Sequence, residues 1–306
     1  MTDNPLVAHV SGDPGDTPLA ELKQHVLLFV EGPPGPKTLQ AIFALYVAHF
    51  GDCFRFYHPT AFGFGPRPWS SDMRAHFEAS ELLQLRRRRI WGYTWADGRG
   101  PSSRNLTVHG YRPFSEAPRT SFVRAEFAWD EDSEAIRSFC ADLLDRVACI
   151  SGTCGYVFQG QPRAGLARAS FDAVYAWARR YWGVEAQDLD VTVMHMRDGY
   201  KCVNWLTIIG ESLAERAPDA LAAAQSAAHG FEVRTGGVIL QAAPGPRLGD
   251  RYRGEDLDGY VAVAEALRPL QVATHGSFGD GCSSKWDQDE TLAWLRRFTE
   301  PDAVNG

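Results

Sequence analysis

Three runs rich in aromatic and β-branched residues, 91–95, 105–111 and 120–129, follow one another with only turns of Gly, Pro and Ser between them. Aromatic and β-branched residues favour strands, and the turn residues separate one strand from the next. Consecutive strands of this kind, with long helices elsewhere in the chain, do not show the strict β-α alternation of a doubly wound sheet. The pattern therefore favours an α+β fold.

The other periodic segments complete this prediction. Compact apolar or alternating runs predict further strands, and apolar residues at spacings of three and four predict helices. The predicted strands are 25–30, 53–57, 155–158, 204–209, 231–234 and 238–241. The predicted helices are 39–50, 80–85, 133–147, 170–181, 211–228 with an interruption near Pro218, 257–267 and 291–298. Residues 58–69, rich in Phe, Gly and Pro, are predicted to form an irregular loop.

We predict antiparallel or mixed sheets packed with helices. Residues 1–20 are polar and contain several Gly, Pro and Asp residues, so they are predicted to be a flexible N-terminal arm. Residues 21–300 are predicted to form a single domain. A weak similarity between the two halves leaves open an arrangement in two similar lobes, with a boundary near residues 160–165.

Charge and composition restrict the function. The 306 residues carry a formal charge of −7, which disfavours direct nucleic-acid binding, because such a surface must supply cations to phosphates. An acidic surface suits a basic protein partner. The first residues lack the pattern of a secretory signal, and no run is long and apolar enough to cross a membrane, so a cytoplasmic location is expected. The six cysteines include no Cys-x-x-Cys pair, which favours free buried thiols.

One stretch resembles a nucleotide-binding loop. Residues 32–38, Gly-Pro-Pro-Gly-Pro-Lys-Thr, lie between a predicted strand and a predicted helix, as a P-loop does. The stretch is one residue too short between its first glycine and Lys37. Pro36 also stands where the second glycine belongs, and proline removes a backbone donor that the phosphates need. We interpret the stretch as a proline-rich turn.

Two other motifs are also better explained by structure. Gly152-Thr-Cys-Gly155 is one residue shorter than a nucleophile elbow, so a buried structural cysteine is the favoured interpretation. The run Arg86–Arg89 could bind phosphate or an acidic partner. An exposed helix end that forms salt bridges is the simpler interpretation.

No segment has the spacing of a metal site or of a known catalytic motif, so we predict no catalytic residue, metal or cofactor. Dispersed residues can still converge in space, as catalytic triads do. The alternative hypothesis is a hydrolase or transferase whose site combines His195, Asp198, His275 and Asp280.

Acidic and aromatic residues are the candidates for a partner-binding surface. Asp130, Glu131, Asp132 and Glu134 surround the start of a predicted helix, where carboxylates cap the helix and could also contact a basic partner. A second set lies in the irregular loop. Trp69 is the candidate for an exposed aromatic anchor, beside Phe62 and Phe64.

Several blocks of the chain resemble one bacterial family. The blocks are Tyr181–Glu185, Asp188–Asp190, Gly199–Thr207 with Asn204-Trp205-Leu206 as the strongest element, Gly237–Ala242, Pro246–Asp250 and Tyr260. The early segment that ends in Arg55-Phe-Tyr57 is similar as well, so the resemblance spans residues 27–270. The chain is similar to the type VI secretion immunity proteins associated with VRR-type nuclease effectors.

That resemblance implies a function by binding. A member of the family is expected to be a cytosolic antitoxin that binds a cognate toxin and blocks its active site, and the family has no agreed catalytic residues to transfer. The expected partner is an effector protein with a basic surface. The matching blocks are mainly core and turn segments, which predict a fold more directly than a partner.

Overall fold

The computed structural model describes residues 4–9, 18–60, 65–99, 102–113, 119–160, 165–279 and 281–305. Within these ranges, twelve strands form one sheet in the order β11-β12-β10-β8-β2-β7-β6-β5-β3-β4, with β1 paired to β2 and β9 to β8. The strands are β1 (Val7–His9), β2 (Pro18–Val30), β3 (Phe56–His58), β4 (Arg67–Pro68), β5 (Ile90–Ala96), β6 (Asn105–Tyr111), β7 (Ser121–Ala128), β8 (Cys149–Gly160), β9 (Glu185–Ala186), β10 (Leu206–Gly210), β11 (Gly230–Arg234) and β12 (Gly237–Gln241).

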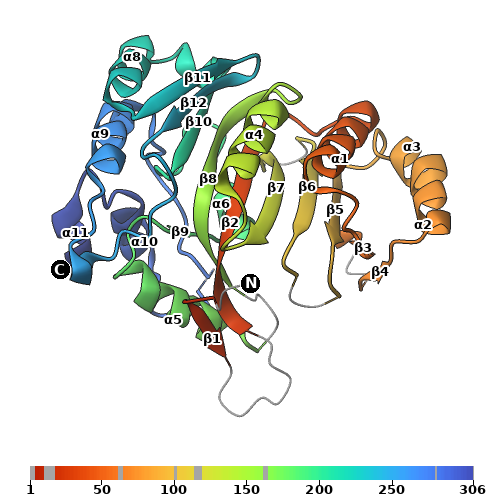
Figure 1. Cartoon of the computed structure of the whole chain (residues 1–306), viewed down its shortest axis with the longest axis horizontal. Coiled ribbons are helices and arrows are strands. Elements are labelled where there is room, and N and C mark those ends of the chain that lie inside the picture. Colours follow the sequence, from red (N-terminus) through yellow and green to blue (C-terminus); the bar gives the residue numbers. More distant parts are fainter. Residues whose placement is uncertain are drawn as a thin grey trace.

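Helices surround this sheet (Figure 1). They are α1 (Pro36–Phe50), α2 (Ser71–His76), the π-helical turn η2 (Phe77–Glu81), α3 (Leu82–Gln84), α4 (Ser133–Leu144), α5 (Ala167–Ala178), α6 (Leu189–Thr192), α7 (Glu211–Ala214), α8 (Pro218–Ala227), the 3-10 turn η3 (Arg251–Arg253), α9 (Asp258–Leu267), the 3-10 turn η4 (Arg268–Leu270), α10 (Gln288–Leu295) and α11 (Pro301–Asn305). Among the described strand pairs, only β8–β9 is parallel. The predicted α+β class is confirmed.

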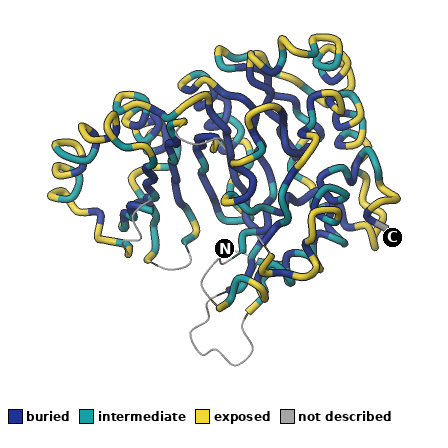
Figure 2. The backbone as a smooth tube through the Cα atoms, turned by 180° about the vertical axis from the view of Figure 1, so that it is seen from behind, coloured by how far each residue is buried: buried dark blue, intermediate teal, exposed yellow. Residues whose placement is uncertain are grey.

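The central strand β2 is covered on both faces. Val26 and Leu28 belong to the main core with residues of α1 and α4, whereas Leu27 and Phe29 pack with Val193 and other residues on the opposite face. A strand buried on both faces reads as a continuous apolar run, which is how residues 25–30 appear in the sequence. Figure 2 shows this middle part of the sheet as buried and the outer helical segments as largely exposed.

The sheet is continuous across the suggested lobe boundary. Strand β8, which ends at Gly160, pairs with β2 on one side and with β10 on the other. Strands from both halves of the chain therefore belong to one sheet. Residues 161–164 lie outside the described residues, and the division into two similar lobes stays a prediction.

The described part of the predicted N-terminal arm is attached to the sheet. Strand β1 pairs with β2, which begins at Pro18, and Ala20 is fully buried. The sequence pattern did not indicate this part of β2 because polar residues interrupt it. Lys23 is buried all the same, and its ammonium group lies 3.2 Å from a carboxylate oxygen of Glu21. A partner of this kind offsets part of the desolvation cost of a buried charge.

Local sequence patterns predicted several elements correctly. Strand β6 has the predicted bounds, and Pro218 separates α7 from α8. The turn before β12 needs Gly237, because its φ is +145° and a Cβ atom there would lie 2.3 Å from the carbonyl oxygen of Ile209. The helical segment predicted at residues 80–85 is longer than expected. It begins at Ser71, where the Ser70 side chain accepts a hydrogen bond from the Met73 N–H at 3.2 Å.

The two rejected catalytic motifs are parts of the scaffold. Helix α1 begins at Pro36, so the proline of the loop occupies the first helical turn, a position that proline favours. Residues 152–155 lie inside β8, with Cys154 fully buried. Burial raises the pKa of the Cys154 thiol well above its usual value, which keeps it protonated and a poor nucleophile.

Candidate functional site

The acidic residues at the start of α4 are engaged in local structure. The Asp132 side chain accepts a hydrogen bond from the Glu134 N–H at 3.0 Å and so caps the helix. Glu131 receives two hydrogen bonds of 2.8 Å from the Arg104 guanidinium. Glu134 pairs with Arg137 on the next helical turn, with a shortest distance of 2.6 Å. The capping role is thus present, and two of the charges are balanced by arginines.

The same segment is held to the sheet and still presents charge to solvent. The Gln24 side chain of β2 donates to the carbonyl oxygens of Trp129 and Glu131, at 3.1 and 2.7 Å. Asp130, Asp132 and Glu134 are exposed. The segment is therefore a firmly placed acidic surface, and its role in binding a partner stays a prediction.

Trp69 is not the exposed anchor that its loop suggested. Only 8% of its surface is exposed, and its ring lies 5.3 Å from Tyr57, 5.8 Å from Phe77 and 6.0 Å from Trp95, measured between ring centroids. Helix α2 follows Trp69 directly in the chain, and the ring of Trp69 packs within a cluster of aromatic side chains. The exposure prediction is wrong because a neighbouring Gly/Pro-rich sequence does not show which rings the chain later covers. Phe62 and Phe64 lie outside the described residues.

A second acidic surface is formed by residues far apart in the sequence. A cleft of about 550 Å³ lies where the ends of β2 and α4 meet the start of α7, and its carboxylates come from Glu31, Asp145, Glu211 and Glu215. Glu31, Glu211 and Glu215 are exposed, and Arg146 also lines the cleft. We name this group of four carboxylates the acidic cleft. No local motif indicates it, because only the fold brings residues 31, 145 and 211–215 together.

Hydrogen bonds hold two of these carboxylates in place. The Ser212 hydroxyl donates to Glu31 at 2.6 Å. The backbone N–H of Thr235 donates to Asp145 at 2.9 Å, and Arg234 also binds Asp145. These hydrogen bonds hold the pKa of Asp145 below its usual value, so this carboxylate stays ionised.

Glu185 and Lys201, from two of the matching sequence blocks, meet His25 of β2 in a buried ionic network. The Lys201 ammonium group lies 2.8 Å from Glu185, and the His25 ring nitrogen Nε2 lies 3.3 Å from the other carboxylate oxygen. Glu185 and His25 are fully buried, and Lys201 is 2% exposed. Burial by itself would raise the pKa of Glu185, but Lys201 and His25 outweigh it and hold the pKa well below its usual range. The carboxylate is therefore charged inside the protein.

Asn204 ties this network to the sheet. Its side-chain amide donates to the Tyr156 carbonyl oxygen at 3.1 Å and to Glu185 at 3.4 Å, while its side-chain oxygen accepts from the Trp205 N–H at 2.7 Å. Gly155 makes room for this side chain, since a Cβ atom there would lie 2.3 Å from the Asn204 oxygen. The Asn-Trp-Leu element is thus a packing device in the core.

The remaining blocks are joined in the same way. The Arg180 guanidinium donates to both carboxylate oxygens of Asp250, at 3.0 and 2.6 Å. The Gly183 N–H donates to the Leu248 carbonyl oxygen at 2.9 Å, and a Cβ atom at Gly183 would lie 2.3 Å from the Arg247 carbonyl oxygen. Blocks that are separate in the sequence therefore contact one another in the folded protein and together stabilise its core.

Two of the four residues of the alternative enzyme hypothesis come together. The rings of His195 and His275 stack with centroids 5.0 Å apart. His275 Nδ1 donates to the Gly276 carbonyl oxygen at 2.7 Å, and the Gly276 N–H donates to His195 Nε2 at 3.0 Å. Burial lowers the pKa of His275 to about 3 and also lowers the pKa of His195. Both rings are therefore neutral and fixed.

The other two residues do not complete a site. Asp198 is exposed, and its carbonyl oxygen accepts a hydrogen bond from Arg216 at 2.8 Å. Asp280 lies outside the described residues. Among the residues that the structure describes, no three side chains of His, Cys, Asp or Glu are arranged to hold a metal ion. The hypothesis of a site built from these four residues thus has only the stacked histidine pair in its favour.

Comparison with known proteins identifies the family of this chain. The family model described as type VI immunity for VRR-NUC matches residues 118–298, which is more than half of the chain. The chain belongs to this immunity family. As a family member, the immunity protein acts against a VRR-NUC effector by binding it. The matched range contains Glu185 and Lys201 of the buried network, the Asn-Trp-Leu element and α4 with its acidic start.

A solved structure supports the fold of the immunity protein. The type VI secretion system (T6SS) protein PA0821 of Pseudomonas aeruginosa aligns with a TM-score of 0.76 and 17% sequence identity, over 97% of this chain and 88% of that one. At this identity the likeness shows a shared fold. A search of curated proteins finds no match. Across the described residues, no helix is long and apolar enough to cross a membrane.

Proposed function

We propose that the immunity protein neutralises its effector by covering the nuclease active site with an acidic surface, in the cytoplasm and without catalysis of its own. The observation that carries this proposal is the family match over residues 118–298. A nuclease presents cations to a phosphate backbone, so an inhibitor gains from exposed carboxylates. The formal charge of −7 is consistent with a basic partner and with the absence of direct nucleic-acid binding.

The acidic cleft and the start of α4 are the proposed contact surfaces. The described lining of the cleft has four carboxylates and one arginine, Arg146. Asp145 is paired with Arg234, and the other three carboxylates still leave an excess of negative charge. Helix α4 connects the two surfaces, with Asp132 at its first turn and Asp145 at its end. Glu31 and Asp145 are held by hydrogen bonds, so a partner would meet carboxylates whose positions are already set.

Charge complementarity of this kind acts mainly on the rate of association. Opposite fields steer two proteins toward each other and raise the association rate constant, and salt screens this effect. We therefore expect the complex of the immunity protein with its nuclease to form faster at low ionic strength. The dissociation rate should depend much less on salt.

The test compares two double variants with equal loss of charge. Glu211→Gln with Glu215→Gln removes two carboxylates from the acidic cleft. Asp72→Asn with Glu78→Gln removes two exposed carboxylates from the helical segment beside the β3–β4 edge of the sheet (Figure 1). The nuclease is the VRR-NUC effector that this chain captures in a pulldown from its native cell. Association rates are measured by surface plasmon resonance, and inhibition by cleavage of a DNA substrate.

The cleft variant should associate roughly tenfold more slowly at low salt, whereas the control variant should match the wild type within about a factor of two. If the two variants slow association equally, the contact surface lies elsewhere and only overall charge matters. If the wild type forms no complex and does not inhibit cleavage, the proposed function is wrong.

A further inference from the structure

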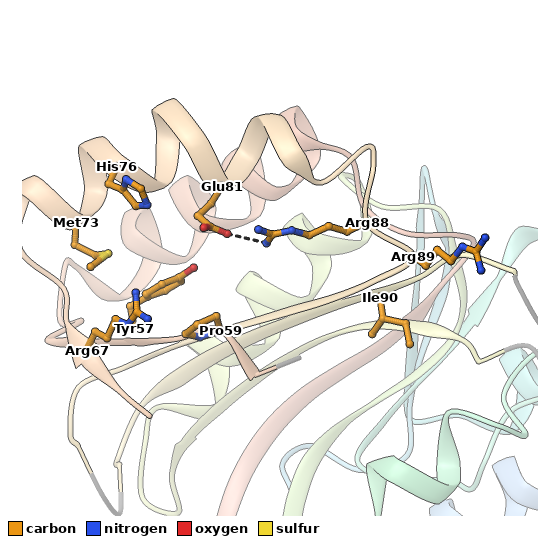
Figure 3. Close-up of a pocket in the computed structure, with 9 residues that line it drawn as sticks. All are labelled: Tyr57, Pro59, Arg67, Met73, His76, Glu81, Arg88, Arg89 and Ile90. Carbon is orange, nitrogen blue, oxygen red and sulfur yellow. Dashed lines mark hydrogen bonds and ion pairs between the residues drawn. The ribbon is translucent and has the colours of Figure 1, made fainter. Parts of the chain in front are cut away.

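A second groove, on the outer part of the fold, has the opposite charge. It lies between the helical segment 71–84 and strands β3 and β5, and its volume is about 400 Å³ (Figure 3). The residues that line it are Tyr57, Pro59, Arg67, Met73, His76, Glu81, Arg88, Arg89 and Ile90. Cavities of this size accommodate small organic molecules or a side chain of a partner. We name it the arginine groove.

The lining of the arginine groove is basic on a chain that is acidic overall. Among the described residues that line it are three arginines, Arg67, Arg88 and Arg89, and one carboxylate, Glu81, which is already bound. Arg88 donates to Glu81 at 2.7 Å, to the Tyr93 hydroxyl at 2.8 Å and to Gln84 at 2.9 Å. The Tyr93 hydroxyl donates to Glu81 at 3.0 Å. The run Arg86–Arg89 thus follows the end of α3 and forms the expected salt bridge, and it also supplies one fixed cation to the groove.

Tyr57 contributes a hydrogen-bond donor to the same space. Its side chain is 3% exposed, and among the described residues its hydroxyl group has no hydrogen-bond partner. Figure 3 shows the hydroxyl pointing into the space below the Glu81–Arg88 pair. Burial raises the pKa of Tyr57 well above its usual value, so the hydroxyl group keeps its proton and can donate it to an acceptor.

An unsatisfied buried hydroxyl destabilises the free protein. Such a group costs about 1–3 kcal/mol relative to one with a partner. It lies here within the electrostatic influence of Tyr93 and Glu81, and of the guanidinium groups of Arg88 and Arg67. A donor without an acceptor, next to guanidinium groups, is the arrangement expected where an anion supplies the missing acceptor.

We propose that the arginine groove binds an oxyanion, a phosphate or carboxylate group attached to a partly apolar body. The Tyr57 hydroxyl donates to the oxyanion, and the guanidinium group of Arg67 offsets its charge, while Arg88 remains paired with Glu81. Pro59, Met73 and Ile90 contact the apolar part. A cation does not fit this site, because Arg88 already neutralises the one carboxylate of the lining.

The first arm of the test uses the full chain and small probes. Inorganic phosphate, phenyl phosphate and benzoate are titrated by isothermal calorimetry. Phenyl phosphate should bind at one saturable site and more tightly than inorganic phosphate, because only the former has an apolar body. Arg67→Met keeps the apolar stem and should weaken binding roughly tenfold or more, as expected for the loss of a charged hydrogen-bond partner. Arg146→Met, in the acidic cleft, is the matched control and should leave the affinity unchanged.

Tyr57→Phe separates a binding role from a structural one. If the hydroxyl serves the ligand, this variant should weaken phenyl phosphate binding roughly tenfold and leave the melting temperature of the free protein unchanged or higher, because it removes an unsatisfied group. A clear fall in the melting temperature would show that the hydroxyl has a partner inside the protein and would overturn the proposal. Absence of saturable binding to all three probes would overturn it as well.

The second arm identifies the source of the oxyanion and rests on the proposed function. The same variants are tested for binding to the nuclease. If Arg67→Met weakens the complex and phenyl phosphate competes with it, the oxyanion is an acidic side chain of the nuclease. If the complex is unaffected, the oxyanion belongs to a free small molecule. A wild-type protein that binds phenyl phosphate but no nuclease would contradict the proposed function and leave the arginine groove intact.

Discussion

The buried network around Glu185 and the exposed acidic start of α4 use the same chemical groups for different purposes. Glu185 and Lys201 lie 2.8 Å apart and are almost completely buried, and Glu134 and Arg137 lie 2.6 Å apart with 65% of the Glu134 side chain exposed. In the interior each charge depends on its partner, because water cannot replace it. At the surface, solvent already stabilises both charges, so the pair contributes little to folding and remains available to a partner.

The largest expected effect is on the buried pair. Lys201→Met leaves the Glu185 carboxylate buried without its nearest cation, and we expect a loss of about 3–5 kcal/mol in the free energy of unfolding, measured by urea denaturation. The matched surface variant Arg137→Met should cost less than about 1 kcal/mol.

The double variant Lys201→Met with Glu185→Gln checks the reason for this loss. It removes both charges and should be more stable than Lys201→Met alone. If Lys201→Met and Arg137→Met lower the free energy of unfolding by the same amount, the distinction between the buried and the exposed ion pair does not hold.

An effect of intermediate size on the free energy of unfolding is expected when the pH is lowered. His275 has a pKa of about 3 in the folded protein, whereas an unfolded histidine titrates near pH 6.5. Between these two values the unfolded chain binds a proton that the folded protein does not, so stability falls as the pH falls. For His275 the loss is about 2 kcal/mol at pH 5 relative to neutral pH, from about 1.4 kcal/mol per pH unit.

His275→Asn removes this contribution and should make the stability less dependent on pH between 6.5 and 4. Urea denaturation at several pH values measures the slope. His109, whose pKa burial lowers to about 4, keeps its own contribution in both proteins. The exposed His229 supplies the control, and His229→Asn should retain the wild-type slope. Equal slopes for His275→Asn and wild type would mean that His275 is not neutral in the fold.

The smallest effect on stability is expected at the surface. Glu134→Gln should change the free energy of unfolding by less than about 0.5 kcal/mol, because its ion pair is exposed. The same change should slow association with the nuclease a few-fold at low salt and leave it nearly unchanged at high salt. An unfolding loss comparable to that of Lys201→Met would show that the surface pair belongs to the core.

Local chemistry made much of the fold predictable. The antiparallel hairpins follow from turn residues such as Gly237, and the break between α7 and α8 follows from Pro218. The buried polar part of β2 was missed because Lys23 and His25 find their partners only in the folded sheet. The block around Asn204 indicated the family from the sequence alone. The structure shows that the side chains of this block stabilise the packing of the core.

The candidate surfaces were less predictable. Asp132 could be assigned as a helix cap from its position alone. Trp69 could not be placed, because its burial depends on rings contributed by Tyr57, Phe77 and Trp95.

The sequence by itself determined the α+β class and the positions of most helices and strands. It also indicated the immunity family, through the Asn-Trp-Leu element. These properties depend on the spacing of apolar residues and on the backbone preferences of single residues, which act over a few positions. Only the tertiary structure decided which charges are buried together, which acids share the cleft with Glu211, and that the Tyr57 hydroxyl lies below the Glu81–Arg88 pair. Those outcomes depend on contacts between distant segments, which exist only once the sheet has brought them side by side.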